Sequence, residues 1–244
     1  MADDLLLLSN SIVHGRGYLD HALEAVEEFL RGRRVVHFVP FALKHHEAYT
    51  ARAAESLGRL GVEVRGLHAE PDPAAAVAGA EVLFVGGGNT FRLLRGVQAA
   101  GIVEIVRRGV AAGELSYLGS SAGTNLACPS IRTTNDMPIV EPASLRAFGL
   151  LPFQVNPHYL DPEPGSTHMG ETREERIRQF LEENDVPVLG LREGAWLRRT
   201  GSSLVLAGET GAVLFRRGMA GASFSPGSDL SFLLSSSPGF DRPV

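Results

Sequence analysis

Short apolar runs alternate with amphipathic stretches through the first half of this chain. The runs hold four to six residues and are often β-branched. Such runs are typical of parallel strands that are buried on both faces of a sheet. We predict five of them, at residues 5–9, 35–40, 62–67, 81–85 and 115–118.

The stretches between these runs have helical periodicity. In residues 18–31 an apolar side chain recurs at steps of three and four, which places these side chains on one face of a helix. They are Leu19, Leu23, Val26 and Leu30. Further helices are predicted at residues 46–60, 73–78, 90–100 and 103–112. Strands that alternate with helices indicate an α/β fold, with a mainly parallel sheet and helices on both faces.

The second half of the chain has a different pattern. A helix is predicted at residues 171–183, where Ile177 and Phe180 share one face. Four short apolar runs follow, most of them separated by Gly-containing turns, at residues 186–191, 195–199, 203–207 and 212–216. This spacing predicts antiparallel strands that close one edge of the sheet. Residues 225–244 are rich in Ser, Pro and Gly, which predicts a loosely ordered tail.

Composition narrows the function classes. The chain has 244 residues, of which 44% are hydrophobic and 21% are charged, as is usual for a folded domain. No internal repeat or low-complexity linker divides it, so we expect a single α/β domain over residues 1–244. The formal net charge of −5 argues against nucleic-acid binding, because phosphate contacts need a dense positive patch.

The single cysteine, Cys128, excludes an internal disulfide framework and a Cys-rich zinc site, and we expect it to be a small buried residue. The N-terminal residues lack the basic start and long apolar stretch of a signal peptide. No apolar run approaches the roughly 20 residues that a membrane helix needs. We therefore expect a cytoplasmic protein with no membrane contact.

The strongest local motif lies at residues 119–123, which read Gly-Ser-Ser-Ala-Gly. They fit Gly-x-Ser-x-Gly with Ser121 in the centre, after a predicted strand and before a possible helix. That is the setting of a nucleophile elbow, whose tight turn exposes the serine hydroxyl and aims the next amide, that of Ala122, at an oxyanion. A small-residue turn without chemistry is the alternative, and Ser120 is the competing hydroxyl.

A second motif, Gly-Gly-Gly-Asn-Thr at residues 86–90, also follows a predicted strand. Glycines let a backbone approach a ligand closely, and Asn89 or Thr90 is suited to cap the next helix. A phosphate site and a plain flexible turn are the alternatives, although the motif lacks the ending of a P-loop. Because ligands bind at the carboxyl ends of parallel strands, both motifs are expected to face one pocket.

A serine nucleophile needs a base, and the base in turn needs a carboxylate to orient it. Of the eight histidines, His158 is the best candidate, because Asn156-Pro157-His158 ends another apolar run. Two carboxylates fit the third position. Glu193 follows the run at residues 186–191, and Asp136 lies in the polar loop Thr-Thr-Asn-Asp. Spacing alone leaves both open.

These motifs resemble the peptidase E family of serine peptidases, and the match runs through most of the chain. The first matching blocks are Leu-Leu-Leu-Leu-Ser-Asn-Ser at 5–11, Val-Pro-Phe-Ala at 39–42 and Gly-Gly-Gly-Asn-Thr-Phe at 86–91. The longest are Ser-Ala-Gly-Thr-Asn-Leu-Ala-Cys-Pro at 121–129 and Ile-Arg-Thr-Thr-Asn-Asp-Met-Pro-Ile-Val at 131–140. Asn-Pro-His at 156–158 and Gly-Glu-Thr-Arg-Glu at 170–174 complete the match.

The resemblance implies a cytoplasmic enzyme that cleaves dipeptides with an N-terminal aspartate and uses no metal or organic cofactor. The family's nucleophile and histidine fall on Ser121 and His158, and its third member on Glu193 or Asp136. The implied fold is similar to the class I glutamine-amidotransferase type. The amides of Gly88 and Ala122 would form the oxyanion hole. Arg173 and Asn89 are our candidates for contacting the substrate's aspartate side chain, because Arg offers a carboxylate a bidentate fork.

This sequence departs from the family at two places. The family usually has a bulky aromatic residue where this chain has Ser120, which predicts a wider pocket or a changed side-chain preference. The segment 225–244 also differs from the family's C-terminus.

Three alternatives to an aspartyl dipeptidase are therefore kept. They are a related serine peptidase for longer acidic peptides or a cyanophycin-like polymer, an esterase of the α/β-hydrolase type, and a non-catalytic small-molecule binding protein. The expected partners are a small peptide and, at most, a second copy in a homodimer.

Overall fold

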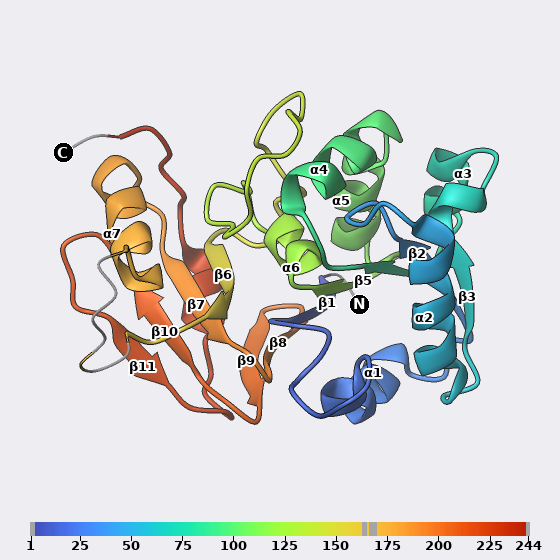
Figure 1. The fold of residues 1–244 in the computed structure, drawn as a ribbon, viewed down its shortest axis with the longest axis horizontal. Coiled ribbons are helices and arrows are strands. Elements are labelled where there is room, and N and C mark those ends of the chain that lie inside the picture. The colour runs from blue at the N-terminus through green and yellow to red at the C-terminus, as the bar shows by residue number, and fades with distance from the viewer. Residues whose placement is uncertain (1–2, 163–164, 166–169, 243–244) are drawn as a thin grey trace.

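Two β-sheets organise the chain in the computed structural model, which describes residues 3–162, 165 and 170–242 (Figure 1). The larger sheet has seven strands in the order β3-β2-β4-β5-β1-β8-β9. The first five strands of this order are parallel, and β8 and β9 are antiparallel to their neighbours. These strands are β1 (Asp4–Leu8), β2 (Val35–Val39), β3 (Glu63–Gly66), β4 (Val82–Val85), β5 (Ser116–Ser120), β8 (Ala195–Thr200) and β9 (Ser203–Gly208).

Helices cover both faces of the larger sheet. In β1, Leu6 and Leu8 pack with α1 and α2, and alternate residues of the same strand pack with α3 to α6 on the other face. All of β1 is buried, as expected for a central parallel strand. The helices are α1 (Leu23–Leu30), α2 (His46–Gly58), α3 (Pro73–Ala78), α4 (Thr90–Ala99), α5 (Val103–Ala112) and α6 (Ala122–Ala127), with short 3-10 turns η1 (Asp20–Ala22) and η2 (Leu67–Ala69).

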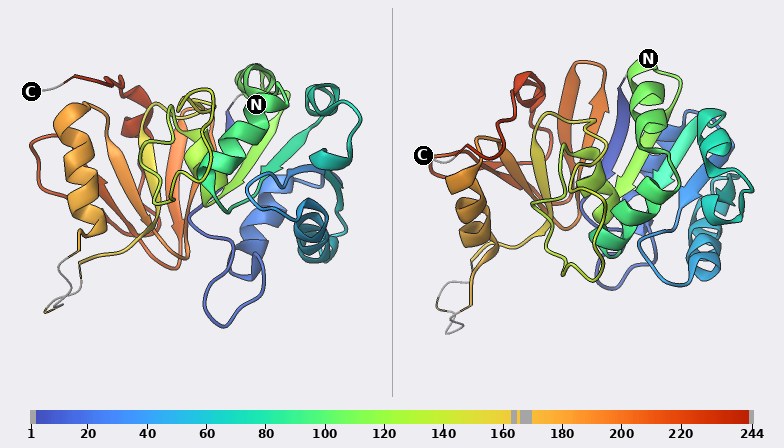
Figure 2. Two further views of the ribbon diagram at one scale, coloured as in Figure 1. Left: turned by 45° about the horizontal axis from the view of Figure 1, so that its top comes forward. Right: turned by 90° about the horizontal axis from the view of Figure 1, so that it is seen from above.

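The smaller sheet has four strands in the order β11-β10-β7-β6. It lies with α7 (Arg173–Glu183) at one end of the molecule (Figure 1, Figure 2). Its outer face packs on α7 through a small cluster that includes Ile177 and Leu181. Its inner face joins the main core, so one hydrophobic core links the two sheets. The strands are β6 (Gln154–Tyr159), β7 (Val188–Arg192), β10 (Ala212–Phe215) and β11 (Ala222–Phe224).

The mainly parallel sheet, the helices on both faces and the antiparallel strands confirm the predicted fold class. The predicted arrangement of the last strands is wrong in one respect. Only β8 and β9 close the edge of the larger sheet, whereas β7 and β10 pair with each other in the smaller sheet. Periodicity predicts that a segment is a strand, but it does not predict which strand is its partner.

The tail from residue 225 is more ordered than its composition predicts. Residues 227–231 bond to the outer edge of β9, as in the 2.8 Å bond from the Leu230 amide to the Leu204 carbonyl. The 3-10 turn η3 (Ser231–Ser235) then follows. Leu230 and Leu233 are completely buried in the main core, which explains why this segment is fixed. Residues 243–244 lie outside the described part of the chain.

Candidate active site

Ser121 lies in a sharp turn between β5 and α6, with φ 52° and ψ −109°. A positive φ is costly for a residue with a side chain, so the surroundings must hold this turn. The flanking glycines allow the close packing that holds this turn in place. A Cβ at Gly123 would lie 2.0 Å from the Val85 carbonyl oxygen, and one at Gly119 would lie 2.8 Å from the Gly123 carbonyl. The Gly-x-Ser-x-Gly motif therefore forms the predicted elbow.

His158 reaches Ser121 from the smaller sheet. It has φ 54° and lies at an irregularity in the pairing of β6 with β7. Its Nε2 is 2.9 Å from the Ser121 Oγ, and its Nδ1 is 2.6 Å from Oε1 of Glu193, in the turn after β7. A carboxylate on Nδ1 favours the tautomer whose Nε2 accepts a proton. The three side chains thus form the hydrogen-bonded series of a serine hydrolase.

Asp136, the other candidate for the third position, is bonded elsewhere. Its Oδ2 accepts hydrogen bonds from the Thr90 amide at 2.7 Å and from the Thr90 hydroxyl at 2.5 Å. Asp136 therefore lies at the N-terminus of α4, where a negative charge interacts favourably with the helix dipole. The structure brings Glu193, and not Asp136, to the imidazole of His158.

The glycine motif lies against the nucleophile. A Cβ at Gly87 would lie 3.0 Å from the Cβ of Ser121. Gly88 has φ 129°, a conformation that other residues rarely adopt, and a Cβ there would lie 2.7 Å from Leu43. The Ala122 amide is at the start of α6, where backbone N–H groups have no partner within the helix. This arrangement is compatible with the predicted oxyanion hole, and the roles of the Gly88 and Ala122 amides stay a prediction.

Comparison with known proteins agrees with this geometry. The sequence model described as Peptidase family S51 matches residues 5–207. The chain belongs to peptidase family S51. It is 59% identical to Peptidase E of Streptomyces coelicolor over 98% of both chains. It is 48% identical to a Drosophila melanogaster protein named "Probable alpha-aspartyl dipeptidase", over 96% of this chain and 98% of that one.

The fold is also found among solved structures. A peptidase from an acI-B1 Actinobacterium superimposes with a TM-score of 0.65 at 17% sequence identity, covering 94% of this chain and 96% of that one. Two sheets and their helices are thus retained where little of the sequence is. Within the part of the chain that the structure describes, no helix is long and apolar enough to cross a membrane. Over the same residues, no group of three or more His, Cys, Asp and Glu side chains is arranged to hold a metal ion.

Asn89 and Arg173 were predicted to contact the substrate. In the structure Asn89 has a structural role. Its Oδ1 accepts a bond from the Arg92 amide, which caps α4 as the sequence predicted, and its Nδ2 donates to the Met137 carbonyl at 2.9 Å. These two bonds hold the start of α4 against the loop that carries Asp136. A direct contact from Asn89 to substrate stays a prediction.

Arg173 is the first residue of α7 and is half-buried. Burial and the charge of Arg176 lower the pKa of Arg173, and the negative charge of Asp136 opposes that change. It also lines a surface depression of about 340 Å³. The influence of the Asp136 charge indicates that Arg173 lies near the loop of Asp136, which bonds to Thr90 at the start of α4.

Ser120, the residue before the nucleophile, faces the interior of the protein. Its side chain is completely buried, on the face of the sheet covered by α1 and α2. There it lies beside Tyr18: burial raises the pKa of the Tyr18 hydroxyl well above its ordinary value, and the Ser120 hydroxyl opposes the rise. Strand alternation directs its side chain into the core. The wider pocket or changed side-chain preference expected from Ser120 stays a prediction.

The motif analysis did not predict that Thr90 and Thr134 join Asp136 in one hydrogen-bonded group. The Thr134 hydroxyl donates to the Thr90 hydroxyl at 2.9 Å, and Thr90 in turn bonds to Asp136. Both threonines belong to motifs that the sequence analysis singled out, but the two residues are 44 positions apart in the chain. Only the fold brings them together. Cys128 is fully buried, as expected, and burial raises its pKa to about 12.

Proposed function

We propose that this chain hydrolyses dipeptides with an N-terminal aspartate through an acyl-enzyme on Ser121. The observation that carries the proposal is the continuous hydrogen-bond series from the Ser121 Oγ through His158 to Glu193. The names of the S51 relatives, Peptidase E and "Probable alpha-aspartyl dipeptidase", support the choice of substrate.

Acylation begins when the Ser121 oxygen attacks the carbonyl carbon of the Asp-Xaa bond while Nε2 of His158 takes the hydroxyl proton. The carbonyl electrons move onto oxygen, where the Gly88 and Ala122 amides would stabilise the negative charge. When the carbonyl re-forms, the C–N bond breaks, and His158 gives its proton to the leaving nitrogen. Glu193 holds the ring and stabilises its charged form throughout.

Deacylation repeats these steps with water. His158 takes a proton from a water molecule as the water oxygen attacks the ester carbonyl carbon. The bond between that carbon and the Ser121 oxygen then breaks, and the proton returns to Ser121. The products are free aspartate and the amino acid Xaa.

The charge of the site supports an acidic substrate. Arg173 feels the charge of Asp136, whose loop bonds to the start of α4 directly after the glycine motif. A guanidinium can bind a carboxylate with two parallel bonds. We infer that Arg173 binds the aspartate side chain. We further propose that the protein acts in the cytoplasm on small peptides, as a monomer or a homodimer, without nucleic-acid or membrane partners.

The test is a set of initial rates with Asp-Leu, Glu-Leu, Asn-Leu, Ala-Leu, acetyl-Asp-Leu and Asp-Leu-Ala, with Ser121→Ala as the blank. We expect fast turnover of Asp-Leu alone and its loss in Ser121→Ala, with an unchanged thermal unfolding temperature. Equal turnover of Asn-Leu would contradict recognition of the carboxylate. Turnover of the acetylated or longer peptide would instead indicate a broader peptidase that uses the same chemistry.

A further inference from the structure

The nucleophile and its base lie on different sheets. Ser121 follows β5 of the larger sheet, whereas His158 and Glu193 are carried by β6 and β7 of the smaller one. Their side chains nevertheless meet at 2.9 Å. A shift of about 1 Å between a nucleophile and its base can lower a rate about 100-fold, so the junction between the sheets must be held accurately.

The end of β1 contacts all three segments. The Leu8 carbonyl accepts a bond from the Ser121 amide at 3.0 Å. The hydroxyl oxygen of Ser9 accepts the His158 amide at 2.9 Å. Asn10 accepts, through Oδ1, the amide of Gly194 at 2.9 Å, directly after Glu193. Three consecutive residues thus each hold one of the three segments that carry the reacting side chains.

Both polar side chains are fixed in place themselves. The Ser9 hydroxyl donates to the Leu191 carbonyl at 2.8 Å, and the Asn10 Nδ2 donates to the Ile12 carbonyl at 2.8 Å. Ser9 is 0% and Asn10 1% exposed. Loss of either oxygen would leave a buried backbone N–H without its acceptor, which destabilises the local conformation that carries the reacting side chains.

The conformation of His158 makes the Ser9 contact specific. With φ 54°, His158 is in the left-handed region, which is unfavourable for a residue with a side chain. Its amide points to Ser9 instead of continuing the regular pairing of β6 with β7. Without this acceptor the strand can relax toward an extended conformation, and the ring then moves away from Ser121.

We propose that Ser9 and Asn10 are positioning residues, which hold the His158–Glu193 pair of one sheet against Ser121 of the other. The proposal deepens the proposed function and rests on it, because it assigns how the reacting side chains of that same site are aligned. Neither residue touches the substrate. Their removal should lower kcat and leave KM nearly unchanged.

The test compares Ser9→Ala and Asn10→Ala with two matched controls. Ser56 is a buried serine whose hydroxyl donates to the Tyr18 carbonyl at 2.7 Å, away from the site. Asn184 is a buried asparagine that accepts the Asp241 amide and donates to the Phe180 carbonyl, as Asn10 does with its own partners. Ser56→Ala and Asn184→Ala therefore remove the same atoms from comparable surroundings.

The main readout is the rate at which a small alkyl fluorophosphonate labels Ser121, measured per folded molecule. This reaction needs the serine and its base but no recognition of a peptide. We expect labelling and kcat to fall at least about 10-fold in Ser9→Ala and Asn10→Ala, as part of the roughly 10²–10⁴-fold that a positioned base contributes. The controls should label at the rate of the unchanged protein.

Each outcome separates the two proposals. If the unchanged protein is labelled but cleaves no peptide, the peptidase function fails, and labelling of the variants still decides the positioning role. If folded Ser9→Ala and Asn10→Ala are labelled at the rate of the unchanged protein, the positioning role is overturned. It is also overturned if the labelling rate falls equally in the Ser56→Ala and Asn184→Ala controls. If Ser9→Ala does not fold, Asn10→Ala and Ser9→Cys decide, since cysteine keeps the shape of the side chain, with a somewhat larger sulfur that is only a weak acceptor.

Discussion

At the scale of single residues, the chemistry depends on which carboxylate meets His158. Glu193 and Asp136 both lie in polar segments beside apolar runs, and their types and spacing fit the role equally well. The difference comes from the fold: the turn after β7 faces β6, whereas the Asp136 loop folds onto the start of α4. Ser121 and His158 were predictable because each comes shortly after an apolar run, but the choice of acid needed the pairing of β6 with β7.

Replacing each carboxylate by its amide should separate their roles. In Glu193→Gln, the new NH₂ can face Nδ1 of His158 and favour the wrong tautomer, so kcat should fall on the order of 10²–10⁴-fold. In Asp136→Asn one oxygen still accepts from Thr90, so the loss of kcat should be much smaller. Steady-state rates on Asp-Leu check both variants.

Thermal unfolding of the same two proteins is the control. Glu193 is half exposed, and its removal should change the unfolding temperature little. Asp136→Asn should lower it slightly, because the charge at the helix N-terminus is lost. If Asp136→Asn loses as much kcat as Glu193→Gln at unchanged stability, the assignment of the triad acid is wrong.

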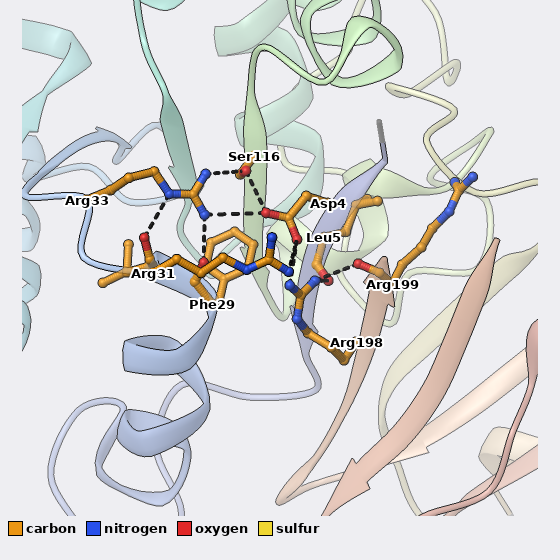
Figure 3. A network of polar contacts seen from close by, with 9 residues as sticks. Asp4, Leu5, Phe29, Arg31, Arg33, Ser116, Arg198 and Arg199 are labelled. Atoms are coloured by element: carbon orange, nitrogen blue, oxygen red, sulfur yellow. Dashed lines mark hydrogen bonds and ion pairs between the residues drawn. The ribbon is translucent and has the colours of Figure 1, made fainter. Parts of the chain in front are cut away.

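At the scale of elements, Asp4 joins four parts of the larger sheet at the end remote from Ser121. Figure 3 shows its carboxylate between Arg33, Ser116 and Arg198. Ser116 donates at 2.7 Å and Arg198 at 2.5 Å, while Arg33 donates at 3.3 Å and also to the Phe29 carbonyl at the end of α1. The cluster therefore links three elements, α1, β5 and β8, to the first residue of β1.

The pKa of Asp4 follows from this environment. Burial raises it, but the bonds from Ser116 and Arg198 and the charges of Arg198 and Arg31 outweigh burial and leave the pKa below its ordinary value. A lowered carboxyl pKa stabilises the folded state above the pKa of the unfolded chain, about 3.9. That stabilisation is lost as the pH falls through the lower folded-state value.

Asp4→Asn should therefore destabilise the protein in a pH-dependent way. At pH 7 it leaves the partly buried guanidinium groups of Arg33 and Arg198 without their counter-charge, a loss of up to about 3 kcal/mol. The difference from the unchanged protein should persist to about pH 5. It should shrink below about pH 4, because the carboxyl is then protonated first in the unfolded chain and, at the lower pKa, in the folded protein. Urea unfolding at pH 7, 5 and 3 measures it.

The exposed pair of Asp20 with Arg59, at 2.5 Å, offers a matched control. Solvent screens such pairs, so Asp20→Asn should change stability much less than Asp4→Asn at pH 7. A constant difference between Asp4→Asn and the unchanged protein from pH 7 to pH 3 would show that the cluster stabilises by packing and not by charge.

Elements of the first half could be predicted well because the central strands β1, β4 and β5 are buried on both faces and leave a clear apolar signal. The edge strand β3 is more exposed. The second half was predictable only as separate strands. The runs at 186–191 and 195–199 look alike, yet the first became β7 of the smaller sheet and the second β8 of the larger. Which strands pair by hydrogen bonds depends on long-range packing, and the local periodicity of apolar residues does not predict it.

At the scale of the whole molecule, the C-terminal segment fastens the two sheets to each other. It runs along the outer edge of β9 and returns beside the smaller sheet. There Gly239 bonds with Asp185, between α7 and β7, and Asp241 pairs with Arg132 in the loop after α6. Low apolar content predicted a loose segment, but two buried leucines, Leu230 and Leu233, are enough to fix it. Composition averages over a segment, whereas packing depends on where its few apolar residues fall.

Truncation should reveal this role in two steps. A chain ending at residue 236 keeps both leucines and loses only the return to the smaller sheet, so its unfolding temperature should fall modestly. A chain ending at residue 225 also loses Leu230 and Leu233, whose burial stabilises the fold by about 3–6 kcal/mol together. It exposes the edge of β9 as well, so we expect a much lower unfolding temperature and association on gel filtration.

Point variants within the full chain separate packing from chain length. Leu233→Ala removes a completely buried side chain, whereas Phe232→Ala removes a neighbour that is 46% exposed. Leu233→Ala should lower the unfolding temperature far more, because it leaves a cavity in the core that joins the sheets. Equal effects of the two variants, or parent-like stability of the chain ending at residue 225, would mean that the sheets hold together through β1 and β8 without help from the tail.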